Sequence, residues 1–457
     1  MEDSGLGVSY SEVLNDKPLP WQKEVDYSEQ LAGGVELQNA PEKIQVASRQ
    51  EAVDKIKEHF RNTLEDRFPH FAFHNVEHSK GVLGSAILFS DSVKLADPTI
   101  FEGKREILEV AASAHDSWQA WEVKGGLRQR NRGFVPQRAE KVVKDVLETG
   151  RKKQIKIPEY DHTHPEEFSI GNEEYSAYEL IDKMTRYIIV ADGRKENAFS
   201  NEEILEAVET IGGTYPSFVF NESFPVNVDP KNETSLDVSE ITDLKSGLHI
   251  SQPYAEKCWA ARAIGTGDLW NHMGSTEGKL SLQAAMKEWE EFHIKFADKL
   301  KRADQTPDDR VEIAGSILDW LFMQEGTIAW QHLNFERFLA TSPLLKTHPK
   351  ADEIRTNIRN AFPLFKANAA YAREAYLTLE SAFGDREYAT FRRELATKGP
   401  DEISEEEKQK LTKLKIERDK RLKENFGEND IEDVEKTKER FEFFRKKVMQ
   451  VELEDLN

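Results

Sequence analysis

The chain has 457 residues, more than one ordinary domain requires, so we expect a principal domain with appended segments. Its net charge of −21 argues against broad binding to nucleic acid or to anionic membrane surfaces, because both need a basic face. The single cysteine, Cys258, excludes an intrachain disulfide and a cysteine-based zinc site, and we expect it to be a buried thiol.

The sequence shows no signal that directs a chain to a membrane. The N-terminus is acidic and lacks the basic-then-apolar order of a signal peptide. No apolar run approaches the roughly 20 residues that a membrane-spanning helix needs. We therefore expect a soluble, cytoplasmic protein.

Apolar periodicity predicts a largely helical chain. Residues 1–45 mix Pro, Gly, Asn and acidic residues without periodicity and are expected to be a weakly ordered leader. The next segment carries apolar residues at helical spacing, and these are Val53, Ile56, Phe60 and Leu64. Further helices are predicted at about 104–116, 136–147, 180–190, 254–265, 282–301 and 311–341.

Two stretches interrupt or extend this pattern. Residues 197–251 contain scattered Gly, Pro, Asn and Asp, and we interpret them as an irregular insertion with a small hairpin. Residues 346–457 form a charged helical extension, expected to be a solvated face or the site of homo-oligomer formation. The principal domain is accordingly placed at residues 46–345.

A set of potential metal ligands lies in the first half of this domain. If Phe73–Val82 is helical, His74 and His78 lie one turn apart on the same face. The adjacent pair His115 and Asp116 ends an apolar run thirty-odd residues later. Imidazole and carboxylate ligands together suit a borderline or hard divalent ion. Three such groups lack only a fourth protein ligand.

With a later aspartate, Asp268, in the setting Gly-Thr-Gly-Asp-Leu, residues 46–340 resemble the HD-domain superfamily of metal-dependent phosphohydrolases. The resemblance implies an all-α bundle with a divalent metal at its centre, which could be Mn, Mg, Fe, Co, Ni or Zn. The implied ligands are His78, His115, Asp116 and Asp268. Asp192 is the alternative fourth ligand, and Asp268 is favoured over it.

The form Phe-His-Asn-x-x-His is also similar to a motif of cyclic-nucleotide phosphodiesterases, whose first histidine donates a proton to the leaving oxygen. Carried over, that role falls to His74. A metal-bound water becomes a usable nucleophile near neutral pH, and an imidazolium of pKa about 6.5 can protonate an alkoxide. Ser117, Trp118 and Gln119 follow the His-Asp pair where guanosine-tetraphosphate hydrolases and deoxynucleotide monophosphatases of the superfamily carry acidic residues, so we do not expect those activities.

Two neighbouring segments could serve a phosphorylated substrate. Arg128, Arg130 and Arg132 lie in a glycine-bounded loop, and guanidinium groups match phosphate oxygens in geometry, although a solvated surface loop is the alternative. Asp161–His164 contains two histidines that could bind a second metal ion, and it too could be a solvated loop.

Together these features predict a metal-dependent phosphohydrolase that acts on a phosphomonoester or phosphodiester, with a small nucleotide as the expected substrate. The alternative is a noncatalytic HD-type module that binds a nucleotide or a partner. The C-terminal extension is expected to be dispensable for metal binding, since every implied ligand precedes it.

Overall fold

The computed structural model describes residues 36–67, 72–117, 123–124, 127–128, 136–156, 172–215, 217–220, 248–252, 254–302, 304–398, 402–427 and 434–451. Helices dominate these ranges and the strands are short, so the expected all-α fold class is confirmed. None of the helices in these ranges is long and apolar enough to cross a membrane.

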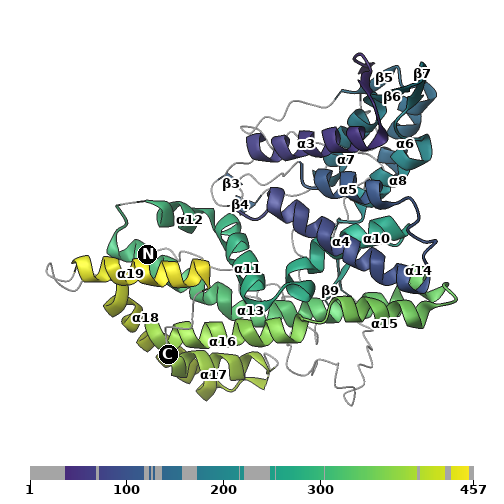
Figure 1. Cartoon of the computed structure of the whole chain (residues 1–457). Helices are drawn as coiled ribbons and strands as arrows, with labels where there is room; N and C mark the ends of the chain where they lie inside the picture. The colour runs from purple at the N-terminus through teal and green to yellow at the C-terminus, as the bar shows by residue number, and fades with distance from the viewer. Residues whose placement is uncertain are drawn as a thin grey trace.

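The helices form two groups that meet along the middle of the molecule (Figure 1). The N-terminal group consists of α3 (Arg49–Arg67), α4 (Val76–Ala96), α5 (Arg105–Ala114), α6 (Pro136–Glu148), α7 (Asn172–Arg186), α8 (Asn201–Gly212) and α10 (Trp259–Trp270). One turn of π-helix, η4 (Asn271–Ser275), continues α10. The C-terminal group consists of α11 (Gly278–Phe292), α12 (Ile294–Lys301), α13 (Pro307–Thr341), α16 (Phe365–Phe383), α17 (Arg386–Ala396), α18 (Glu405–Phe426) and α19 (Val434–Gln450). Between them, α14 (Pro343–Lys346) leads to α15 (Ala351–Ala361), which packs on α4.

The N-terminal group also contains short strands. The antiparallel pairs are β1 (Leu37–Asn39) with β5 (Lys153–Ile155), β3 (Val123–Lys124) with β4 (Leu127–Arg128), and β8 (Ser217–Phe220) with β9 (Leu248–Ser251). A three-stranded sheet joins β2 (Ile44–Val46), β6 (Tyr187–Ala191) and β7 (Arg194–Asn197), with β2 and β6 parallel. The prediction of a helix at 180–190 is therefore wrong at its C-terminal end. The helix α7 ends at Arg186, and the β-branched run Ile188–Val190 lies in strand β6.

The first predicted helix is confirmed as α3, because Val53, Ile56, Phe60 and Leu64 are all buried. The prediction that residues 197–251 are irregular is wrong for α8. Ser200 and Glu203 form a capping box at its start, and the helix buries an apolar face against α5, α7 and α10. Two strands from this stretch, β8 and β9, pair antiparallel, and the residues between them, 221–247, lie outside the described ranges.

Close packing of α4 on α10 depends on a glycine. A Cβ atom at Gly267 would lie only 2.5 Å from the carbonyl oxygen of Val82, so no larger residue fits without a shift of the two backbones. Cys258 caps the start of α10 through its Sγ and is half-buried rather than buried, and burial raises the pKa of its thiol to about 11. The tight crossing brings the N-terminal turns of α4 beside the C-terminal turn of α10.

The residues after 345 are packed into the bundle rather than appended to it. Phe365 of α16 contacts Phe335 of α13, with ring centroids 5.3 Å apart. Arg418 of α18 forms a buried ion pair with Glu380 of α16 at 2.8 Å. An aromatic cluster holds the last helices in place, and it comprises Phe383, Phe426, Phe441 and Phe444. Much of the apolar surface of the extension is thus covered within the chain itself.

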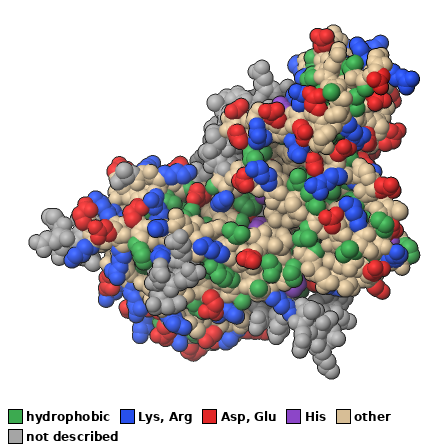
Figure 2. Space-filling view, viewed as in Figure 1, with side chains coloured by type: hydrophobic (Ala, Val, Ile, Leu, Met, Phe, Trp, Pro, Cys, Tyr) green, Lys and Arg blue, Asp and Glu red, His purple; other side chains and the backbone are tan. Residues whose placement is uncertain are grey.

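The face shown in Figure 2 carries acidic and basic side chains interspersed over both groups of helices. Most of the large apolar side chains of the described residues are buried, with Leu95, Leu280 and Ile416 among the exposed ones.

Candidate metal centre

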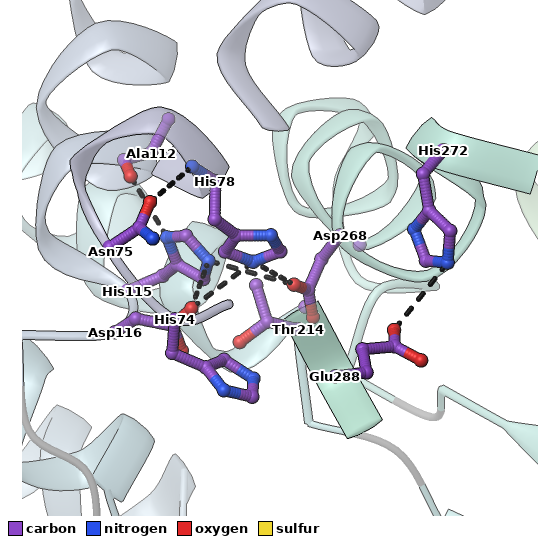
Figure 3. A network of polar contacts seen from close by, with 12 residues as sticks. His74, Asn75, His78, Ala112, His115, Asp116, Thr214, Asp268, His272 and Glu288 are labelled. Atoms are coloured by element: carbon purple, nitrogen blue, oxygen red, sulfur yellow. Dashed lines mark hydrogen bonds and ion pairs between the residues drawn. The ribbon is translucent and has the colours of Figure 1, made fainter. Parts of the chain in front are cut away.

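Two histidines and two aspartates from three helices of the N-terminal group converge at one point (Figure 3). His78 lies in the first turn of α4, His115 and Asp116 follow α5, and Asp268 lies in the last turn of α10. One ligand atom from each residue lies within 4.8 Å of all the others. The structure therefore brings together the residues that the sequence placed in one metal site.

The spacing of these atoms fits a coordination shell. His78 Nε2 is 3.2 Å from both Asp116 Oδ2 and Asp268 Oδ1. His115 Nε2 lies 3.0 Å from Asp116 Oδ2 and 3.6 Å from Asp268 Oδ1. Ligands about 2.1 Å from a common ion are separated by about 3.0 Å in octahedral and about 3.4 Å in tetrahedral geometry. The cluster could hold a divalent metal ion, and these distances do not select one element.

His115 is oriented for metal binding by its backbone. Its Nδ1 is 2.8 Å from the carbonyl oxygen of Ala112, to which it donates a hydrogen bond. In the neutral ring this hydrogen bond places the proton on Nδ1, so that the lone pair of Nε2 faces the cluster once its own proton is displaced. Nε2 is buried and makes no hydrogen bond within the part of the chain described. A cation at the centre of the cluster would satisfy that buried nitrogen.

The electrostatics of the cluster are those of a site made for positive charge. Burial disfavours the imidazolium form, but the facing carboxylates raise the pKa of His78 and raise that of His115 well above its ordinary value. Burial also disfavours the carboxylates, yet the histidines hold the pKa of Asp116 well below its ordinary value and lower that of Asp268. Asp268 keeps 21% of its side chain exposed and Asp116 14%, whereas His115 is fully buried.

His74 does not share a helix face with His78, as the sequence had suggested. Asn75 is the N-cap of α4 and accepts hydrogen bonds from the backbone N–H groups of Glu77 and His78. The helix therefore begins at Val76, and His74 lies in the bend before it. The ring of His74 nevertheless remains beside that of His78, with centroids 5.5 Å apart.

Glu291 of α11 holds His74 in this position. Its Oε1 accepts a hydrogen bond from His74 Nδ1, and its Oε2 accepts from the backbone N–H groups of Phe73 at 3.0 Å and His74 at 3.1 Å. Burial disfavours a charged His74, but attraction to Glu291 and to the metal-site aspartates raises the pKa of His74 to about 9. Sequence reasoning missed Glu291, because nothing in an amphipathic helix 217 residues away signals this contact.

The remaining predicted site residues lie elsewhere or are not described. Asp192 occupies the exposed turn between β6 and β7, at φ 51°, and is not part of the cluster. Arg128 lies in β4, and its side chain is outside the described part of the structure. Arg130, Arg132 and the segment Asp161–His164 are also outside it. Ser117, next to the cluster, is buried and donates a hydrogen bond to Ser176 of α7.

Comparison with known proteins found no match: no protein-family model, no curated protein and no solved structure is significantly similar to this chain.

Proposed function

We propose that the protein is a metal-dependent phosphohydrolase. One observation carries the proposal: the His–Asp cluster could hold a divalent ion, and a histidine held by a carboxylate stands directly beside it. Hydrolysis of a phosphoric ester needs a nucleophilic water, neutralisation of charge at phosphorus and a proton for the leaving oxygen. The cluster and His74 supply these requirements from opposite sides of one small site.

His78, His115, Asp116 and Asp268 would hold the ion. When bound, a divalent metal lowers the pKa of a water molecule and neutralises charge on phosphoryl oxygens. The protein side chains fix where this chemistry takes place, and the close approach of α10 to α4 at Gly267 keeps the proposed ligands of the two helices near each other. The partial exposure of Asp268 leaves a path for water and substrate.

His74 is the proposed general acid. Glu291 occupies Nδ1, so Nε2 is the nitrogen that remains to give a proton to the leaving alkoxide. With a pKa raised to about 9, the ring carries its proton at neutral pH. A bound cation would offset the attraction of Asp116 and Asp268 and bring this pKa closer to neutrality, while the contact with Glu291 persists.

The proposed substrate is a small phosphoric monoester or diester, a nucleotide in particular. Arg128, Arg130 and Arg132 are proposed to bind its phosphate oxygens, because they follow the metal-bearing helix α5 closely in sequence and guanidinium groups bind phosphate well.

The decisive experiment measures metal content and hydrolysis in the same preparation. Protein purified without chelator is expected to contain about one divalent ion per chain and to hydrolyse nucleoside monophosphates, cyclic nucleotides or simple diesters after addition of Mn²⁺ or Mg²⁺. The variant His78→Ala should lose metal, whereas His348→Ala, which removes a histidine paired with Asp97 instead, should retain it. Absence of stoichiometric metal together with absence of hydrolysis would favour the noncatalytic module.

A further inference from the structure

His272 is a further histidine beside the candidate metal centre, and the proposed reaction does not use it. It lies in η4, one turn after Asp268 in the chain (Figure 3). Its ring packs edge-on against Phe73, with centroids 5.6 Å apart. The same Phe73 ring contacts His74 and His78, at 5.0 and 4.6 Å. A π-helical turn is rare and is frequently found at functional sites.

α11 directs a second carboxylate at this histidine. Glu288 precedes Glu291 by one helical turn, so both project from the same face of α11. Glu288 Oε1 lies 3.4 Å from His272 Nε2. Figure 3 marks this contact with a dashed line. His272 is nine-tenths buried, a costly position for a polar ring that performs no function. Of the three histidines that contact Phe73, His74 thus faces Glu291 and His272 faces Glu288.

His272 and His74 differ in the hydrogen bonds that they can form with a substrate. Burial, together with the nearby His78 and against the attraction of Asp268, lowers the pKa of His272 to about 4, so the ring is neutral at pH 7. Nε2 is buried and makes no hydrogen bond within the described residues, and the negative charge of Glu288 at 3.4 Å favours the tautomer with the proton on this nitrogen. Nδ1 then carries a lone pair and can only accept a hydrogen bond. His74, by contrast, is held as a proton donor.

We propose that His272 binds the substrate through Nδ1, by accepting a hydrogen bond from a hydroxyl or amine group on the organic part of the phosphoric ester. This inference rests on the proposed function. Phosphoryl oxygens are acceptors and carry negative charge, so neither the Nδ1 lone pair nor the adjacent Glu288 carboxylate suits them. Sugar hydroxyls and base amines of nucleotides have the required donors. The pair of His272 and Glu288 therefore selects esters that carry a donor close to the scissile bond.

Two substitutions separate this role from a structural one. When asparagine replaces histidine, its amide group takes about the position of imidazole Nδ1. The amide group of a substituted glutamine takes about the position of Nε2. His272→Asn should therefore keep most of the preference for the donor-bearing ester, measured as the ratio of kcat/KM for a nucleotide and its deoxy or deamino analogue. His272→Gln should reduce this ratio by about 10- to 100-fold, because one substrate hydrogen bond is lost.

The matched control is His332, another buried histidine whose pKa burial lowers to about 4. It stacks on Phe365 in the C-terminal group, so His332→Asn and His332→Gln should leave the ratio unchanged. Metal content is measured for all variants and is expected to equal that of the parent.

Each other outcome has a distinct meaning. If the metal-loaded parent hydrolyses no ester, the proposed function fails and this inference fails with it. If the parent is active and shows no preference for a donor, or both variants keep the parental ratio, only the role of His272 is overturned. If His272→Gln keeps the parental ratio and His272→Asn loses it, His272 acts by its contact with Glu288 and not through Nδ1. Loss of metal from both variants would place His272 in the metal centre instead.

Discussion

His74 Nδ1 and a carboxylate oxygen of Glu291 are in direct hydrogen-bonding contact, although 217 residues separate the two in the chain. His74 belongs to the segment that leads into α4, and Glu291 belongs to α11 of the C-terminal group. The candidate metal ligands all come from the N-terminal group. The site is therefore assembled from both groups, with ligands on one side and the partner of the proposed acid on the other.

Glu291→Gln is expected to impair proton donation without loss of metal. The amide cannot attract the imidazolium charge, so the pKa of His74 should fall and its ring should be less firmly oriented. We expect kcat for esters of poor leaving groups to fall by about 10- to 100-fold, as for other residues that orient a catalytic group. Steady-state kinetics measures the change in kcat, and metal analysis measures the metal content of the variant. The neighbouring variant Glu290→Gln, which alters no contact with His74, is the control, and an equal loss in both variants would contradict the assignment.

His74→Ala and His78→Ala should separate the proposed acid from a proposed ligand. His78→Ala should lower metal occupancy and thermal stability, because metal binding to the folded state is linked to folding. His74→Ala should keep the metal and lose about 10²- to 10⁴-fold in rate on poor leaving groups. A leaving group of low pKa needs little protonation and should partly rescue His74→Ala alone. Equal loss of metal in both would make His74 a ligand.

The convergence of His78, His115, Asp116 and Asp268 could be predicted from the sequence, because the resemblance to a known family implies that these residues share one site. The carboxylate partners of the flanking histidines His74 and His272 could not be predicted. Glu288 and Glu291 lie among charged neighbours such as Lys287 and Glu290, a pattern typical of a solvated helix face. Glu291 is buried because α11 packs against the segment before α4, and Glu288 faces His272 because α11 also packs against η4.

The errors in secondary structure have local causes that are visible in hindsight. Asn75 lies inside the stretch for which the sequence predicts a helix, but asparagine is a strong N-cap residue and the helix begins only after it. The capping box of Ser200 and Glu203 was hidden within a stretch rich in turn-forming residues. The run Ile188–Val190 is apolar enough for a helix, and its pairing with a strand more than a hundred residues earlier decides the outcome.

His332 should make the folded state sensitive to acid. Its imidazole is unprotonated in the folded chain until about pH 4, because burial lowers its pKa and the nearby Lys366 and Arg359 lower it further, against the opposing attraction of Glu336. The unfolded chain takes up this proton near pH 6.5, so the unfolded state binds more protons between these values. Stability should fall by about 2–3 kcal/mol as the pH drops from 6.5 to 4, and no further below that.

Denaturant unfolding at several pH values tests this, with His332→Gln as the comparison. The variant has no titrating group at this position, so the difference in unfolding free energy between parent and variant should shrink as the pH falls through this window. A difference that stays constant from pH 7 to pH 4 would show that His332 is protonated equally in both states.

The last prediction concerns the helices after residue 345, which the sequence presents as an extension and the structure packs into the bundle. Arg418 and Glu380 are 2% and 0% exposed, and their ion pair joins α18 to α16. Arg418→Met leaves the Glu380 carboxylate buried without its cation and should lower the free energy of unfolding by about 3–5 kcal/mol. Lys415→Met removes an exposed ion pair with Asp419 in the same helix and should cost at most about 1 kcal/mol.

The double variant Arg418→Met with Glu380→Gln should recover part of the loss, because no unpaired charge then remains buried. Thermal or denaturant unfolding of the full chain gives the stabilities, and metal analysis of the folded fraction completes the test. Metal content should stay at the parental value in all of these variants, since every candidate ligand precedes residue 345. Equal stability of Arg418→Met and Lys415→Met would mean that α18 contributes little to the fold. Loss of metal from a variant that remains folded would mean that the C-terminal helices supply a ligand.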